Sequence, residues 1–164
     1  IVELNDSPDD VIRVLEDAAK KSKYDSTIEN ACDRPDFYHA GFSKYFLIRL
    51  ELVNSEFENP KHYTVKSVEH VLPQTLLAGS DWCDWFDEER KERYVHNIGN
   101  LVLLSKGKNS SASNKPFSEK KSAYLKDRVS AFPRSIQVLD YEKWTQDDII
   151  QRTQAARQSL LSAL

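Results

Sequence analysis

The sequence has no methionine, only two cysteines and no long apolar run. Cys32 and Cys83 lie far apart without CxxC spacing, which excludes a structural zinc site made of cysteines. The longest apolar runs, such as residues 45–48, are far shorter than the roughly 20 residues of a membrane span. We therefore expect a soluble protein without a membrane partner, and two thiols without a secretory signal suggest the cytoplasm.

The chain also lacks an initiator methionine, and residues 1–6 resemble neither a signal peptide nor a natural start. We interpret the sequence as a piece from the C-terminal part of a longer protein. Its 164 residues fit one domain and are enough to bury a core.

The chain has no net excess of positive charge, but its charges are unevenly placed. The net charge is −3, which argues weakly against nucleic acid. Residues 1–60 carry thirteen acids and seven bases, whereas residues 101–128 carry seven bases and two acids. Such a local basic segment is compatible with phosphate contact, although a charge run is more often a solvated helix face.

Helical patterns are expected at both ends of the chain. Ser7 and Pro8 are typical of a helix start, and residues 24–34 form a polar stretch that we expect to interrupt the helical pattern. Pro35 opens a second helix with a largely apolar composition. A capping box at residues 145–148 predicts a closing amphipathic helix.

The centre predicts a strand, an excursion, a second strand and a helix. Alternation over residues 63–68 indicates a strand that leads into Glu69 and His70. A short helix over residues 87–94, a strand over 101–104, a loop over 106–115 and a basic helix from Pro116 to about Arg128 follow. We interpret the three tryptophans as packing residues; they are Trp82, Trp85 and Trp144.

An acid and an imidazole stand side by side at Glu69 and His70, and carboxamides follow at Asn100, Asn109 and Asn114. Phosphodiester hydrolysis requires a base that deprotonates water and a cation that neutralises charge on the phosphoryl group. Histidine is suited to the first role near neutral pH. Carboxylate and carboxamide oxygens suit one Mg²⁺ or Mn²⁺ ion rather than zinc.

Three blocks in order carry a family resemblance: residues 68–74 (VEHVLPQ), 98–104 (IGNLVLL) and 109–121 (NSSASNKPFSEKK). In these blocks the chain resembles the His-Me finger, or HNH, nucleases, and more narrowly the C-terminal nuclease domain of GmrSD-type modification-dependent restriction enzymes. The resemblance spans about Phe46 to Leu125. The helical flanks lie outside it.

The resemblance implies that His70 is the general base and that Asn100 fixes the finger loop and helps to orient His70. It implies that Asn109 and Glu69 bind the metal, with Asn109 also counted among the catalytic residues. Glu69 stands where HNH enzymes often have Asp. Because its side chain is longer, two arrangements stay open, direct coordination of the metal ion and coordination through a water molecule. Three further residues are assigned to the active site without a defined role: Asn114, Gln74 and His96. The remaining histidines are interpreted as structural.

The implied fold is α+β, a mostly helical domain that contains a ββα-metal nuclease core. Residues 1–60 form its helical N-terminal part, 61–130 the core and 131–164 the closing helix. We expect five lysines to contact DNA, namely Lys106, Lys108, Lys115, Lys120 and Lys121.

The implied function is a divalent-metal-dependent DNA endonuclease or nickase of a bacterial antiviral restriction system, which acts on phage or modified DNA in the cytoplasm. A ParB-like nucleotide-handling domain would precede it in the full-length protein. Two alternatives stay open, a catalytically retired module that only binds nucleic acid and an enzyme that cuts RNA.

Overall fold

The computed structural model describes residues 18–55, 67–125 and 132–162. Over these residues the protein is mostly helical with one small antiparallel sheet, as expected for an α+β domain. None of the described helices has the length and apolar composition of a membrane-spanning segment. The elements are α2 (Ala18–Cys32), η1 (Phe37–His39), α3 (Ser43–Val53), β1 (Ser67–His70), α4 (Asp81–Trp85), α5 (Glu88–Tyr94), η2 (Ile98–Asn100), β2 (Leu101–Leu104), α6 (Lys106–Ala112), α7 (Phe117–Leu125), α8 (Pro133–Gln137), η4 (Val138–Asp140) and α9 (Gln146–Ser162).

The predicted break over residues 24–34 and the predicted loop over 106–115 are both wrong. α2 continues to Cys32, where Ala31 and Cys32 are buried against the core. α6 begins after Ser105, whose hydroxyl accepts a hydrogen bond from the Lys108 amide, and it ends before Ser113, which has a φ of 42°. Tertiary packing thus makes helices of segments whose composition alone is typical of loops.

Other elements agree with the sequence patterns. The second strand covers residues 101–104 as predicted, and Asp87 caps α5. The capping box at α9 is present, because Asp148 accepts hydrogen bonds from the Thr145 amide and hydroxyl, both at 2.7 Å. The predicted helix start at Ser7 and the strand residues 63–66 lie outside the described part of the chain.

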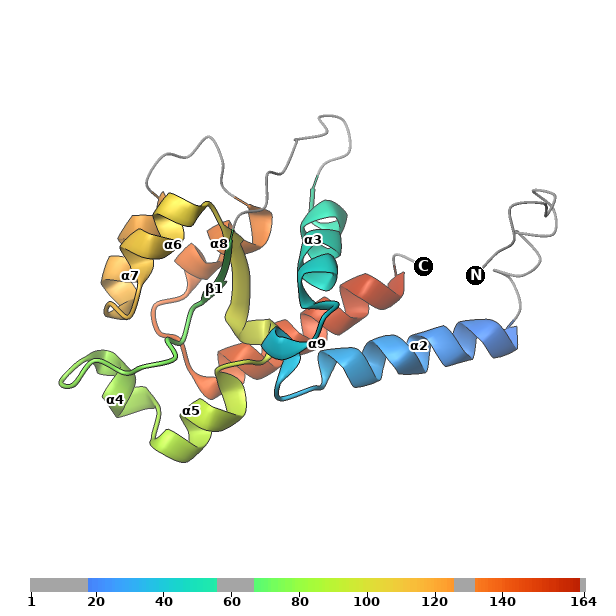
Figure 1. Ribbon diagram of the computed structural model, residues 1–164, viewed down its shortest axis with the longest axis horizontal. Helices are drawn as coiled ribbons and strands as arrows, with labels where there is room; N and C mark the ends of the chain where they lie inside the picture. Colours follow the sequence, from blue (N-terminus) through green and yellow to red (C-terminus); the bar gives the residue numbers. More distant parts are fainter. Residues whose placement is uncertain (1–17, 56–66, 126–131, 163–164) are drawn as a thin grey trace.

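The sheet joins β1 to β2 although about thirty residues separate them in the sequence. Ser67 faces Leu104 and His70 faces Leu101 in the register. The sheet lies between α6 and α7 on one side and α3 on the other, while α2 and α9 run side by side (Figure 1). All four residues of β2 are buried, so both faces of the sheet are covered.

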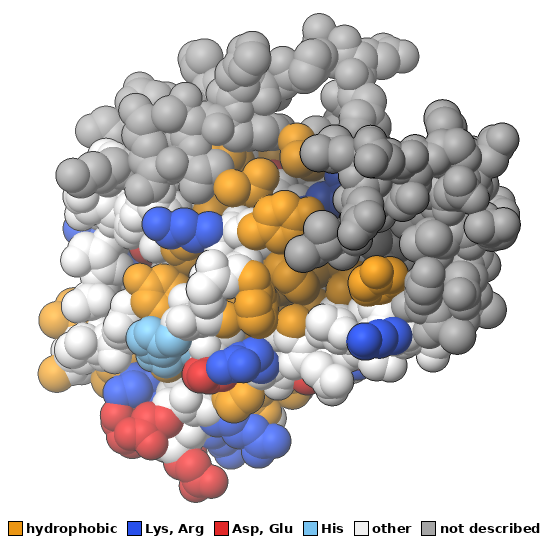
Figure 2. All heavy atoms as spheres, turned by 45° about the vertical axis from the view of Figure 1, so that its right-hand side comes forward, with side chains coloured by type: hydrophobic (Ala, Val, Ile, Leu, Met, Phe, Trp, Pro, Cys, Tyr) orange, Lys and Arg blue, Asp and Glu red, His pale blue; other side chains and the backbone are white. Residues whose placement is uncertain are grey.

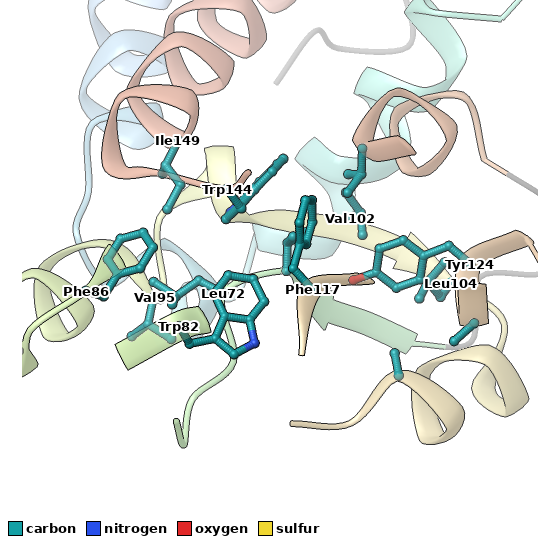
Figure 3. Close-up of a cluster of buried hydrophobic side chains, with 14 residues drawn as sticks. Leu72, Trp82, Phe86, Val95, Val102, Leu104, Phe117, Tyr124, Trp144 and Ile149 are labelled. Carbon is teal, nitrogen blue, oxygen red and sulfur yellow. The ribbon is translucent and has the colours of Figure 1, made fainter. Parts of the chain in front are cut away.

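Two apolar clusters hold this arrangement together. The first gathers Trp82, Phe117 and Trp144 around Leu72 and Val102 (Figure 3). The second joins α2, η1, α3, β2 and α9. Trp82 and Trp144 are fully buried and half-buried Trp85 packs against the same cluster, as expected for packing residues.

The turn before β2 packs tightly on α9. A Cβ atom on Gly99 would lie 2.1 Å from the Ile149 carbonyl oxygen and 2.5 Å from the Thr153 hydroxyl oxygen. Arg152 Nε also donates to the Gly99 carbonyl at 3.1 Å. Only glycine permits this approach, which fixes the position of Asn100 and the start of β2.

Candidate active site

A polar pocket of about 260 Å³ opens at the sheet, lined by residues from β1, the loop after it, the α6 end and α7. The predicted site residues Glu69, His70, Gln74, Asn109 and Asn114 all line it, and Tyr38, Ser67, Ser113 and Lys120 join them. The sequence blocks therefore meet at one place in the fold. Asn100 and His96 are not among the described lining residues.

His70 is the last residue of β1 and is only 6% exposed. Its Nε2 atom lies 3.1 Å from Nδ1 of His96, and its Nδ1 atom lies 3.3 Å from Nε2 of Gln74. Burial, with His96, Lys120 and His39 nearby, lowers the pKa of His70 to about 3. The imidazole is therefore neutral at cellular pH and carries one lone pair for proton acceptance.

This pKa shift predicts an acid-dependent loss of stability. The ordinary pKa is 6.5 and the folded value is about 3. Since unfolded His70 binds its proton more tightly, its contribution to stability is complete above pH 6.5 and is lost as the pH falls toward 3. Urea unfolding from about pH 7.5 to about pH 4.5 should show the free energy of unfolding falling more steeply for wild type than for His70→Gln. Parallel curves would contradict the shift.

Glu69 is buried and paired with Lys120 from α7. Lys120 Nζ donates to Glu69 Oε1 and to the His70 carbonyl, both at 2.7 Å, and the Tyr124 hydroxyl donates to Glu69 Oε1 at 3.1 Å. Burial raises the pKa of Glu69 and lowers that of Lys120, while their mutual attraction opposes both shifts. The pair is neutral overall, and Lys120 fixes the position of the Glu69 carboxyl group beside the pocket.

Asn109 connects α6 to β1. Its Nδ2 atom donates to the Ser67 hydroxyl and to the Val68 carbonyl, the latter at 3.1 Å. These two bonds use the amide nitrogen, so the Oδ1 atom carries the lone pairs that could serve a ligand. Asn114 follows the helix end, is exposed and lines the same pocket.

Asn100 is fully buried and holds the loop after β1. Its Oδ1 atom accepts from the Leu72 amide at 2.7 Å and from Trp144 Nε1 at 3.0 Å. Its Nδ2 atom donates to the Leu72 carbonyl at 3.0 Å and the Val95 carbonyl at 2.8 Å. These contacts agree with the expectation that Asn100 fixes the loop, none of them reaches the His70 ring, and its listing among the catalytic residues stays a prediction.

The proposed DNA contacts of Lys108 and Lys120 need correction because both side chains are buried, whereas the contact of half-buried Lys121 stays a prediction. Lys108 is buried with Nζ donating to the Tyr124 carbonyl, Lys120 is paired with Glu69, and Lys121 Nζ donates to the Tyr141 carbonyl. Lys115 is exposed beside Glu119, and the Lys106 side chain lies outside the description. On the face in Figure 2, basic side chains are scattered among acidic and uncharged ones.

Sequence reasoning missed the role of Lys120 although a signal was present. Phe117, Lys120 and Tyr124 are spaced i, i+3 and i+7 on α7, which places them on one helix face, and all three are buried. The lysine in an otherwise apolar stripe requires a buried acid as its partner. Tyr38 had no local signal, since it reaches the pocket only through the packing of η1 on the His96 backbone.

Comparison with known proteins identifies the family. No curated protein and no solved structure matches the chain significantly. Residues 22–158 match the model of the family described as GmrSD restriction endonucleases, C-terminal domain. This match covers most of the chain, including the pocket and the sheet. The chain therefore belongs to the C-terminal domain family of the GmrSD restriction endonucleases.

Proposed function

We propose that the chain is a divalent-metal-dependent DNA endonuclease or nickase of the HNH type, built on a ββα-metal core. Membership in a restriction endonuclease family implies a nuclease. The observation that carries the finer proposal is that β1 delivers Glu69 and His70, and α6 delivers Asn109, to one polar pocket. A buried neutral imidazole beside oxygen ligands is the minimum that phosphodiester hydrolysis requires.

The residues at the pocket fit Mg²⁺ or Mn²⁺. One Glu69 carboxylate oxygen, Oε1, is held by Lys120 and Tyr124, and a cation would use Oε2 together with Asn109 Oδ1. The described residues contain no group of three His, Cys, Asp or Glu side chains suited to a metal. A site with one or two protein ligands and several waters is typical of magnesium and not of zinc. When bound, the cation supplies electrostatic stabilisation of the phosphoryl oxygens and the leaving oxygen.

His70 performs the proton transfer in this proposal. Its neutral ring accepts a proton from water, the resulting hydroxide attacks phosphorus, and the bond from phosphorus to the 3′ oxygen breaks. The products are a 5′-phosphate and a 3′-hydroxyl that takes a proton from solvent. Glu69 and Asn109 would hold the cation, which would neutralise charge on the phosphate, and Gln74 contacts the base from the pocket side.

We propose phage or modified DNA as the substrate, in the bacterial cytoplasm, as part of an antiviral restriction system. A ParB-like domain of the same full-length protein is the proposed partner. Lys115 and Lys106 remain candidates for phosphate contact, because Lys115 is half-exposed near the pocket residue Asn114 and Lys106 begins α6.

The test is nicking of supercoiled plasmid by the purified chain. We expect conversion to open circles with Mg²⁺ or Mn²⁺ and none with EDTA, because the carboxylate and the carboxamide alone do not neutralise the phosphate. A gel shift in EDTA measures DNA binding separately. Binding without nicking under any divalent metal would instead identify a retired, DNA-binding module. Cleavage of RNA but not of DNA in a parallel assay would identify RNA as the substrate.

A further inference from the structure

The two ring nitrogens of His70 have different surroundings. Nδ1 lies 3.3 Å from Gln74, a residue that lines the pocket, whereas Nε2 lies 3.1 Å from Nδ1 of His96, which is not among the described lining residues. Nδ1 is therefore the atom on the pocket side. Nε2 is directed away from it, toward a second imidazole.

A neutral imidazole has one donor nitrogen and one acceptor nitrogen. If Nδ1 of His70 accepts from the Gln74 amide, its proton is on Nε2 and His96 Nδ1 is the acceptor. This tautomer also directs the Nδ1 lone pair into the pocket, where a water that displaces the Gln74 amide can give its proton to Nδ1. The opposite tautomer would direct an N–H into the pocket and could not take a proton there.

Contacts with η1 fix the position of His96, so that its ring can determine which nitrogen of His70 carries the proton. Its carbonyl accepts from the Tyr38 amide at 3.0 Å, and its ring stacks on Tyr38 with centroids 5.6 Å apart and an angle of 16°. His39 packs edge-on against the same ring, with centroids 4.5 Å apart. Burial lowers the pKa of His96, which favours the neutral ring that can accept a hydrogen bond.

We propose that His96 is a positioning residue for the reaction: it accepts the Nε2 proton of His70, keeps the His70 Nδ1 lone pair directed at the pocket, and stabilises the imidazolium that forms when Nδ1 takes a proton from water. This rests on the proposed nuclease function. In the step, a water O–H bond breaks, an N–H bond forms at Nδ1, and the Nε2 proton stays on His70 and continues to donate to His96. The orienting role that the family resemblance gives to Asn100 thus belongs, for the ring itself, to His96.

The direct test is the tautomer of His70, measured by two-bond ¹⁵N–¹H correlation in metal-free protein labelled with ¹⁵N-histidine. We expect a protonated Nε2 and an unprotonated Nδ1 in wild type, with the signal assigned by its loss in His70→Gln. His96→Phe keeps an aromatic ring without an acceptor and should abolish this preference. His96→Asn offers a carboxamide oxygen and should retain it, while His39→Phe, a matched control on the same cluster, should leave it unchanged.

Nicking rates should follow the tautomer. His96→Phe is expected to lose about 10- to 100-fold in rate, consistent with the cost of misplacing a catalytic group, with partial recovery in His96→Asn and little change in His39→Phe. The inference is overturned if the His70 proton is found on Nδ1 in the wild-type protein. It is also overturned if His96→Phe keeps both the tautomer and the nicking rate of the wild-type protein. If the wild-type protein does not nick plasmid at all, the proposed function fails, and the catalytic part of this inference fails with it. If the wild-type protein is active and His96→Phe is equally active, only this inference fails.

Discussion

Replacing His70 with alanine is expected to reduce plasmid nicking by about 10²- to 10⁴-fold, which is the usual contribution of a general base. The variant removes the neutral imidazole that lines the pocket between Gln74 and His96 and leaves Glu69 and Asn109 in place. The measurement is the initial rate of open-circle formation at saturating Mg²⁺. DNA binding in EDTA should change little, because the ring makes no phosphate contact before chemistry in the proposal.

The matched control for this variant is His39→Phe, which keeps an aromatic ring against His96. His39 is exposed and belongs to the same aromatic cluster, but it contacts the His96 ring rather than the pocket. We expect it to nick at nearly the wild-type rate. Urea unfolding of both variants establishes that they are folded, and a folded His70→Ala protein as active as the control would exclude His70 as the base.

Replacing Lys120 with methionine is expected to lower the free energy of unfolding by about 3–5 kcal/mol, the usual cost of breaking a buried ion pair from one side. Lys120 is 1% exposed, and its ammonium is within 2.7 Å of both Glu69 Oε1 and the His70 carbonyl. Methionine fills a similar volume, so the loss comes from a buried carboxylate without its cation and a carbonyl without its donor. Urea unfolding at neutral pH measures this decrease in the free energy of unfolding.

Two further variants separate the ion pair from general effects of the substitution. Lys115→Met changes a lysine whose side chain is 50% exposed and paired with Glu119 on the surface, and it should cost less than about 1 kcal/mol. The double variant Glu69→Gln with Lys120→Met removes the buried charge and should recover much of the loss. If Lys120→Met is no more destabilised than Lys115→Met, the buried pair does not stabilise the fold.

The strands that carry the site were predictable because alternation and apolar composition along a short segment favour a strand. Alternating and apolar runs predicted strand residues 67–68 and 101–104, whereas the convergence of Glu69, His70, Asn109 and Asn114 was implied by the family resemblance. The helix at α6 was not predictable in this way. Its Gly, Ser and Asn content favours a loop, and it is helical because Asn109 bonds to β1 and buried Ala112 packs in the core.

The sequence by itself determined the family and the two strands, and it carries the proposal of which residues would hold a cation and accept a proton. The tertiary structure alone decided which of these residues are accessible. Lys120 meets Glu69 across 51 positions and His70 meets His96 across 26. Whether a lysine contacts solvent or a buried carboxylate, and which nitrogen of a histidine faces a pocket, depends on packing between distant segments, and no local pattern encodes that packing.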